Sequence, residues 1–170
     1  MKLESFIRDV PDFPKKGILF KDITPLLANG KALASAIEAM KQAVHGLKPD
    51  AVAGIESRGF LFGTPLAMAL GVGFVPIRKP GKLPWKTNRI QYSLEYGTDA
   101  VEVHQDALQK GQKVLLVDDL LATGGTAGAS IRLLEGLGAK VVGAVFAIEL
   151  GFLDGRKKLQ PVPVHALLKY

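Results

Sequence analysis

Short apolar runs with almost no polar alternation constrain the fold of this chain more than any other feature. They occur at residues 51–55, 72–77, 114–117, 141–148 and 162–168. A strand that is apolar on both sides must be covered on both faces, which is typical of parallel sheets. Helical segments lie between the runs. The sequence therefore predicts an α/β fold with a central, mainly parallel sheet flanked by helices.

Two helices are indicated by apolar residues that return at helical spacing. Between Lys31 and Leu47 the apolar positions 33, 37, 40, 44 and 47 fall on one helical face. Residues 126–137 repeat this pattern, and Gly138 is placed to end that helix. The uncharged stretch 59–77 is long enough to span a bilayer. However, Pro65, Pro76 and several glycines favour a short helix, a turn and the strand Phe74–Ile77.

Length and composition narrow the setting. A chain of 170 residues with 48% hydrophobic residues is expected to form one globular domain, and no repeat or linker divides it. The absence of cysteine excludes disulfides and thiolate metal sites and favours a reducing, cytoplasmic location. The first ten residues include acids and lack the apolar core of a signal peptide.

The net charge of +6 is compatible with anionic partners. Residues 78–94 carry five bases and no acid, namely Arg78, Lys79, Lys82, Lys86 and Arg89. Pro80, Gly81 and Pro84 lie in the same segment, directly after a predicted strand. This pattern favours a mobile flap over an RNA-binding helix, and we expect neither a nucleic acid nor a membrane as partner.

The stretch VLLVDDLLATGGT, residues 114–126, joins a buried strand to the start of a helix through a glycine-rich loop. Ligands of open parallel sheets lie beyond the carboxyl ends of the strands, where helix N-termini attract anions. Glycines at 124 and 125 allow close backbone approach, and Thr123 and Thr126 add hydroxyl donors. The loop alone would also suit an ordinary turn in which threonine caps the helix.

Two adjacent carboxylates, Asp118 and Asp119, favour the ligand-binding alternative. Adjacent strand residues point to opposite sides, so this pair is poorly arranged to chelate one metal. A sugar with vicinal hydroxyls can donate to both carboxylates and can separate them from a phosphate in the loop. Competing phosphate motifs, the P-loop and G-x-G-x-x-G, are absent from the sequence, and the three histidines show no metal-ligand spacing.

On these residues the chain resembles the type I phosphoribosyltransferases. The segment VLLVDDLLATGGT resembles their phosphoribosyl-pyrophosphate motif, and the double acid followed by ATGGT most resembles the branch that uses adenine. Further similar stretches are DFPKKGILFKDITPLL, GIESRGFLFG, PIRKPGKLP, SLEYGTD and GRKKL. The resemblance covers nearly the whole chain. It implies one domain, with a small N-terminal hood at about residues 1–30 and a mobile flap at about 80–98.

The activity implied by the resemblance is transfer of the 5-phosphoribosyl group from phosphoribosyl pyrophosphate to adenine, which yields AMP and pyrophosphate in purine salvage. Mg²⁺ is expected as cofactor, bound mainly through the diphosphate substrate and water, without a dedicated protein site. The resemblance also implies a homodimer.

The resemblance assigns roles at the sugar-phosphate site. Asp118 and Asp119 would hold the ribose hydroxyls, and Arg58 would take the pyrophosphate, with Arg78, Lys79 and Lys82 reaching over it. A non-proline cis peptide bond is expected near Glu56–Ser57. The cradle for the 5′-phosphate would consist of Ala122, Thr123, Gly124, Gly125 and Thr126.

The resemblance also assigns the base pocket. Phe20 would stack on adenine, while backbone groups of Leu19 and Lys21 would read its edge and Leu150 would close the pocket. Lys21 replaces an arginine that is common in the family, a change that backbone recognition should tolerate. Glu95 would transfer the proton, with Tyr96 packing nearby or contacting the leaving group. The segment 85–91 corresponds to nothing in the family, so the role of Trp85 stays open.

Two alternatives remain at this point. One is a transferase of the same fold that accepts hypoxanthine or guanine, which the double acid and ATGGT argue against. The other is a non-catalytic regulator that senses phosphoribosyl pyrophosphate. Such regulators usually carry a nucleic-acid-binding element, and no such extension is recognisable in this sequence.

Overall fold

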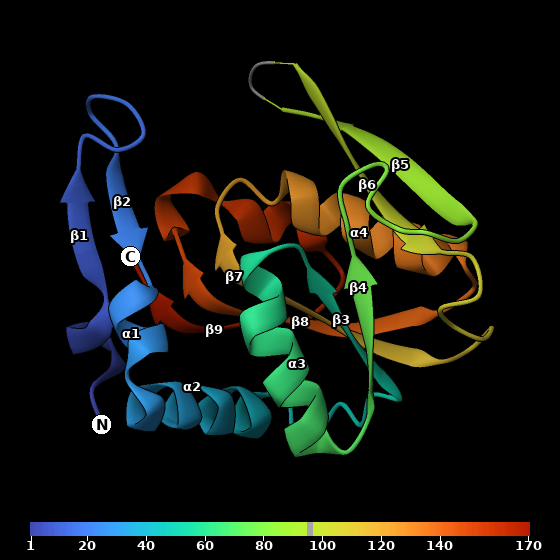
Figure 1. Ribbon diagram of the computed structural model, residues 1–170, viewed down its shortest axis with the longest axis horizontal. Coiled ribbons are helices and arrows are strands. Elements are labelled where there is room, and N and C mark those ends of the chain that lie inside the picture. The colour runs from blue at the N-terminus through green and yellow to red at the C-terminus, as the bar shows by residue number, and fades with distance from the viewer. Residues whose placement is uncertain (95–96) are drawn as a thin grey trace.

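The computed structural model describes residues 1–94 and 97–170 and is built around a five-stranded parallel sheet (Figure 1). The strand order is β4-β3-β7-β8-β9. The bounds are β3 Ala51–Ile55, β4 Gly73–Ile77, β7 Lys113–Leu121, β8 Lys140–Glu149 and β9 Val164–Lys169. The predicted parallel α/β fold is thus confirmed, and all five apolar runs form strands of this sheet.

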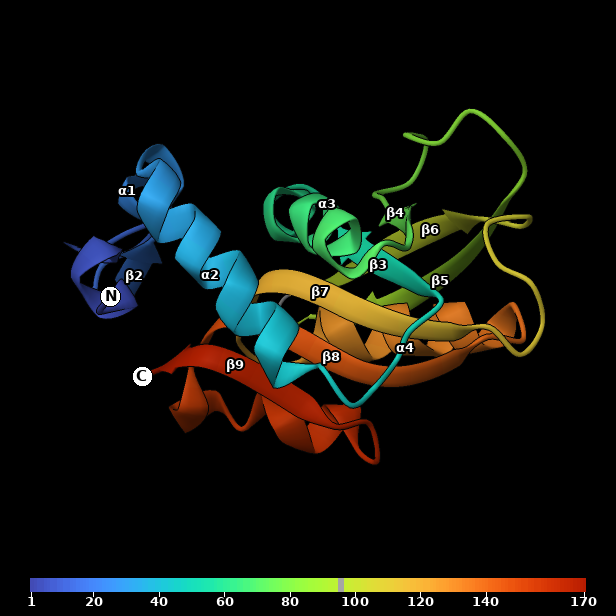
Figure 2. The same ribbon diagram turned by 90° about the horizontal axis from the view of Figure 1, so that it is seen from below.

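Helices and a hairpin cover the two faces of the sheet (Figure 2). Helices α2 (Gly30–Ala43) and α3 (Arg58–Leu70) pack on one face. Helix α4 (Gly125–Gly136) and the hairpin of β5 (Thr87–Ser93) and β6 (Thr98–His104) pack on the other. Successive residues of β7 serve both layers, because Leu115 and Val117 join the α2–α3 core whereas Val114 and Leu116 join the α4 core. This two-sided burial explains why the strands lack polar alternation.

The helix predictions are confirmed to within a few residues. Helix α2 begins at an Asn29 cap, whose side chain accepts a hydrogen bond from the backbone N–H of Ala32 at 3.0 Å. The uncharged stretch divides as expected into α3, a left-handed Gly71 and β4. Within the described residues, no helix is long and apolar enough to cross a membrane.

The N-terminal residues form a small unit beside the sheet. It consists of the 3-10 helix η1 (Leu3–Phe6), the antiparallel strands β1 (Arg8–Pro11) and β2 (Leu19–Asp22), and helix α1 (Thr24–Ala28). The sequence predicted only an extended piece at 18–20 for this region. The C-terminal part follows β8 with two 3-10 helices, η2 (Gly151–Leu153) and η3 (Gly155–Leu159), before β9.

Two predictions need correction. Strand β7 does not end at Val117 but continues through Asp118 and Asp119 to Leu121, because β8 still pairs with it there. Pairing with β3, however, ends at Val117, so both acids stand beyond one neighbouring strand. The flap segment contains β5, paired with β6, whereas the sequence suggested only a loop, since its prolines and charges obscure the strand pattern.

Candidate active site

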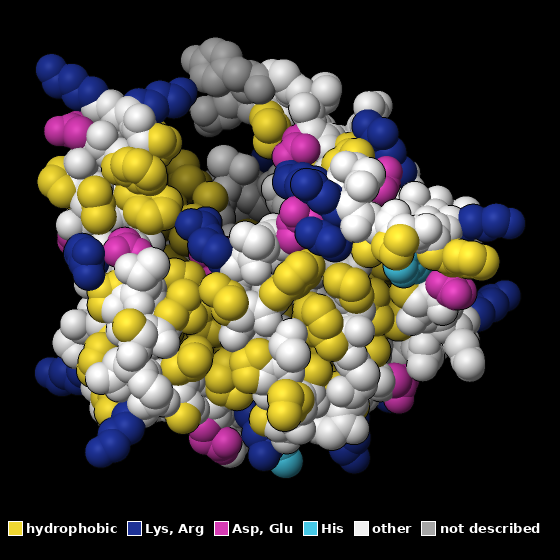
Figure 3. Space-filling view, in the orientation of Figure 1, with side chains coloured by type: hydrophobic (Ala, Val, Ile, Leu, Met, Phe, Trp, Pro, Cys, Tyr) yellow, Lys and Arg dark blue, Asp and Glu magenta, His cyan; other side chains and the backbone are white. Residues whose placement is uncertain are grey.

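The site lies at the carboxyl edge of the sheet, where the segments after β3, β4, β7 and β8 meet. Figure 3 shows a hollow between the β1–β2 hairpin and the β5–β6 hairpin, with Lys and Arg side chains along its rim. This arrangement brings the acids of β7, the first turn of α3 and the loop before α4 to one edge.

Asp118 and Asp119 share one cation, Arg58. The guanidinium Nε of Arg58 lies 2.8 Å from Asp119 Oδ2, and Asp118 Oδ1 accepts the backbone N–H of Asp119 at 2.9 Å. Arg58 reaches this position because α3 packs closely on β7. A Cβ added to Gly59 would stand only 2.8 Å from Asp118 Oδ1, so glycine is needed at that contact.

The charges of this acid pair are incompletely balanced. Burial raises the pKa of Asp118 well above its ordinary value, and the neighbouring Asp119 carboxylate raises it further. Burial also raises the pKa of Asp119, although Arg58 acts in the opposite direction. Arg58 thus acts on both carboxylates, of which Asp119 is buried and Asp118 partly buried, and both would gain from additional donors such as a pair of sugar hydroxyls.

The loop after β7 encloses a cavity of about 90 Å³. Its lining includes all five residues of the predicted phosphate cradle, Ala122, Thr123, Gly124, Gly125 and Thr126. Gly124 has a left-handed conformation with a φ of 77°, which permits the tight turn into α4. The cavity therefore lies at the N-terminus of a twelve-residue helix, where backbone N–H groups and the helix dipole favour an anion.

The back of this loop is fixed by close backbone packing. A Cβ on Gly124 would overlap the carbonyl oxygen of Gly155, and a Cβ on Gly155 would overlap that of Ala122. Gly155 belongs to the GRKKL stretch, which forms η3. The C-terminal segment therefore supports the loop of residues 122–126 from behind.

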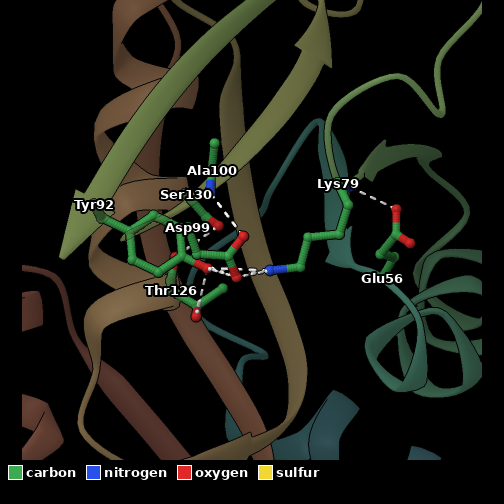
Figure 4. A network of polar contacts seen from close by, with 7 residues as sticks. All are labelled: Glu56, Lys79, Tyr92, Asp99, Ala100, Thr126 and Ser130. Atoms are coloured by element: carbon green, nitrogen blue, oxygen red, sulfur yellow. Dashed lines mark hydrogen bonds and ion pairs between the residues drawn. The ribbon is translucent and has the colours of Figure 1, made fainter. Parts of the chain in front are cut away.

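A polar network joins the loop to the segments after β3 and β4 (Figure 4). The Lys79 ammonium contacts Asp99 and lies 3.3 Å from the phenol oxygen of Tyr92, which in turn lies 3.0 Å from Thr126 Oγ1. Burial opposes the charge of Lys79, but its hydrogen bonds to Asp99 and Tyr92 hold its pKa above the ordinary value.

The basic residues predicted to bind pyrophosphate lie in different surroundings. Glu56 Oε2 accepts the backbone N–H of Lys79 at 2.6 Å and lies 3.1 Å from Arg78 Nε. Arg78 Nη1 also donates to the carbonyl of Lys82 at 3.2 Å, while the exposed Lys82 side chain has no ion pair with a described residue. The expected cis bond is confirmed between Glu56 and Ser57.

The predicted base pocket begins at β2. The Phe20 ring packs edge-on against Phe13 at 5.1 Å, and the Arg58 guanidinium carbon lies 5.7 Å from the Phe20 ring centre. Arg58 therefore stands between the aromatic ring and the acids of β7. The Lys21 side chain is occupied elsewhere, since its ammonium pairs with Asp9 at 2.6 Å and lies 3.9 Å from the Tyr170 ring centre.

Leu19 is half exposed beside Phe20. Leu150 is attached to β7 by a hydrogen bond from its backbone N–H to the carbonyl of Leu121 at 2.9 Å. Glu95, predicted to transfer the proton, and its neighbour Tyr96 lie outside the described residues. Their roles, like the ligand roles of the other site residues, stay predictions.

Comparison with known proteins places the chain in a family. The family described as phosphoribosyl transferase domain matches residues 22–163. The chain belongs to the phosphoribosyltransferase family. A relative from Desulfitobacterium hafniense, named adenine phosphoribosyltransferase, is 55% identical over 170 residues, covering 100% of this chain and 98% of its own.

Solved phosphoribosyltransferase structures agree with the fold. That of adenine phosphoribosyltransferase from Thermoanaerobacter pseudethanolicus has a TM-score of 0.97 and 56% identity, over 99% of this chain and 98% of that chain. The enzyme of the same name from Saccharomyces cerevisiae, complexed with adenine and D-2,5-dideoxy-2,5-imino-altritol 1,6-bisphosphate, has a TM-score of 0.92 and 44% identity. This match covers 98% of this chain and 96% of the yeast chain.

Sequence reasoning missed several residues that hold this phosphoribosyltransferase site together. Tyr92 directly precedes the SLEYGTD stretch and Asp99 ends it, while Gly155 and Arg156 begin GRKKL. In these motifs only Glu95 and Tyr96 were singled out from the sequence. The motifs themselves were the available signal. Their contacts with the loop arise from tertiary packing, which no local pattern reveals.

Proposed function

We propose that this protein is an adenine phosphoribosyltransferase that transfers the 5-phosphoribosyl group from phosphoribosyl pyrophosphate to adenine, for purine salvage. The observation that carries the proposal is the single strand-loop-helix unit of residues 113–136. It presents one buried and one partly buried carboxylate next to a loop cavity of about 90 Å³, with Arg58 between the acids and Phe20. Full-length relatives bearing this name support the choice of adenine.

The chemistry balances on this geometry. A ring nitrogen of adenine attacks the anomeric carbon while the bond from that carbon to the diphosphate oxygen breaks, which yields AMP and pyrophosphate. Positive charge develops on the ribose, so Asp118 and Asp119 stabilise it while they hold the hydroxyls. The loop of residues 122–126 fixes the 5′-phosphate and orients the sugar. Glu95 handles the proton of the attacking base.

Mg²⁺ belongs to the proposal as a companion of the substrate. Among the described residues, no three acids, histidines or cysteines are grouped to hold a metal ion. The acids of the site already share Arg58. A diphosphate supplies the oxygen ligands that Mg²⁺ prefers, so the residues present suit a magnesium ion bound through substrate and water. When bound, the ion would neutralise the leaving pyrophosphate.

The proposal includes a homodimer in the cytoplasm. The family resemblance suggests the dimer, and the absence of cysteine suits a reducing compartment. Leu61 and Met68 on α3 are 46% and 77% exposed, which offers apolar surface for a second copy. Sedimentation equilibrium of the purified chain tests this, since a monomer at micromolar concentration would contradict it.

The decisive experiment measures pyrophosphate release from phosphoribosyl pyrophosphate and Mg²⁺, with adenine, hypoxanthine or guanine supplied separately. Release with adenine alone is expected. Release with another base would keep the sugar-phosphate site and overturn the assignment of the base pocket. Binding without release would favour the regulator, an alternative that the transferase relatives do not support.

Glu95 is tested by Glu95→Gln, which keeps the shape of the side chain and removes its basicity. We expect turnover to fall by roughly 10²–10⁴-fold, the usual contribution of a general acid–base group. Adenine binding should change little. Near-full turnover of the variant would remove Glu95 from the mechanism.

A further inference from the structure

The phenol of Tyr92 lies where the β5–β6 hairpin meets the phosphate loop. Tyr92 is only 7% exposed, and its ring belongs to the core beneath α4. Its oxygen lies 3.1 Å from Asp99 Oδ2, 3.3 Å from Lys79 Nζ and 3.0 Å from Thr126 Oγ1. Figure 4 shows these side chains converging on the phenol oxygen. Thr126 also lines the loop cavity, so one hydroxyl separates Tyr92 from the expected phosphate.

The contact between Tyr92 and Thr126 depends on which of the two hydroxyls supplies the proton. Lys79 can only donate and ionised Asp99 can only accept, whereas Tyr92 and Thr126 each have one proton to give. While Tyr92 donates to Asp99, the contact between the two hydroxyls must use the proton of Thr126. That proton is then unavailable to a phosphate in the loop.

Asp99 does not depend on Tyr92 for its hydrogen bonds. Its Oδ2 contacts the Lys79 ammonium, and its Oδ1 accepts the backbone N–H of Ala100 at 2.8 Å. The phenol proton can therefore turn from Asp99 to Thr126 Oγ1 without leaving the carboxylate unpaired. The backbone carbonyl of Thr126 is engaged separately, since it accepts a hydrogen bond from Ser130 Oγ at 2.9 Å.

We propose that Tyr92 is a positioning residue for the 5′-phosphate, which acts through the hydroxyl of Thr126. When phosphate enters the loop, the phenol donates to Thr126 Oγ1 and the Thr126 proton points at the phosphate. The contact also attaches strand β5 to the phosphate loop, so the hairpin next to the site helps to order the loop. This inference rests on the proposed function.

The test is the substitution Tyr92→Phe, which removes one oxygen and keeps the ring in the core. We expect the Kd for phosphoribosyl pyrophosphate with Mg²⁺, measured by calorimetry without adenine, to rise about fivefold, the weight of one hydrogen bond. The KM for this substrate should rise in parallel, while the KM for adenine stays unchanged. Tyr170→Phe is the matched control and should leave all three constants unchanged.

A double-mutant cycle separates this role from general support of the fold. In a Thr126→Val background, which lacks the mediating hydroxyl, Tyr92→Phe should weaken binding no further. In a Thr126→Ser background, which keeps the hydroxyl, the fivefold effect should return. Equal effects of Tyr92→Phe in the Val and Ser backgrounds, or no effect in the wild type, would overturn the inference.

The outcomes also separate this inference from the proposed function. If the wild-type protein fails to bind phosphoribosyl pyrophosphate, both are wrong. If the wild type binds it and releases pyrophosphate with adenine, but Tyr92→Phe binds equally well, only the role of Tyr92 is wrong.

Discussion

Two buried acidic sites at the ends of the neighbouring strands β7 and β8 differ in how their charge is balanced. Glu149, 3% exposed, receives both ends of one guanidinium, with Arg156 Nε at 2.6 Å from Oε1 and Nη2 at 2.7 Å from Oε2. Among the described residues, Asp119 is ion-paired with Arg58, whose charge also acts on Asp118. The pKa of Glu149 is accordingly lowered by Arg156, whereas burial raises the pKa of both aspartates.

This difference separates a structural acid from acids suited to a ligand. The Arg156 side chain also donates to the carbonyl of Val164 at 2.7 Å, so the pair ties β8 to β9 and is complete without a ligand. The aspartates of β7 can accept further hydrogen bonds from a ligand, because each carboxylate has more lone pairs than the contacts with Arg58 and the Asp119 N–H use. Incomplete balance of this kind is common where a protein recognises a polar substrate.

The largest expected effect tests the complete pair. Arg156→Ala leaves Glu149 buried and unpaired and should lower the free energy of unfolding by about 3 kcal/mol. Denaturant unfolding monitored by circular dichroism measures it. Lys157→Ala is the control, because Lys157 pairs with Asp154 on the surface and should cost no more than about 0.5 kcal/mol. Similar losses for the two variants would contradict the structural role.

At the Asp118–Asp119 pair, a substitution should instead lower activity and leave stability unchanged or higher. Asp118→Asn removes one of two adjacent carboxylate charges, so the melting temperature should stay constant or rise. Its kcat/KM should fall roughly 100-fold, because charged hydrogen bonds to the ribose are lost. Steady-state kinetics and thermal unfolding measure the two effects. The exposed Asp106→Asn should change neither, and a strong loss of stability in Asp118→Asn would equate the two acidic sites.

Gly155 adjoins both sites, since it precedes Arg156 and packs against the loop of residues 122–126. Gly155→Ala should displace the loop and cost about 1–3 kcal/mol of stability, as overpacking usually does. Affinity for phosphoribosyl pyrophosphate should fall as well, which calorimetry would detect. Gly136→Ala is the matched control, because a Cβ there meets open space. Unchanged affinity in Gly155→Ala would show that η3 does not position the loop.

The pH dependence of stability should have opposite signs at the two sites. The pKa of Glu149 is lowered, so its contribution is present above the ordinary value of 4.5 and is lost as pH falls through the folded pKa. The pKa of Asp118 is raised, so the free protein loses stability as pH rises from 3.8 through the folded value.

Unfolding free energies of the wild type and Asp118→Asn across the acid range would reveal this difference. The free energy of unfolding of the variant should rise relative to that of the wild type as pH rises. This change should be smaller than the preceding effects. A constant difference across that range would show that Asp118 has an ordinary pKa.

The sequence by itself determined the parallel α/β class, the five sheet strands, the helices 30–43 and 125–136 to within a few residues, and the glycine-rich loop between β7 and α4. These depend on local properties, namely apolar period, glycine conformation and helix termini, which act over a few residues. The family resemblance added the adenine reaction and the cis bond at Glu56.

Only the tertiary structure decided which distant groups meet. The strand order and the β5–β6 hairpin depend on chain crossings and packing. Packing also decides three contacts: that of Tyr92 with Thr126, that of Gly155 with the loop and that of Arg156 with Glu149. Burial, and with it the raised pKa of Asp118, exists only once the layers close, because a carboxylate loses water only when other segments surround it.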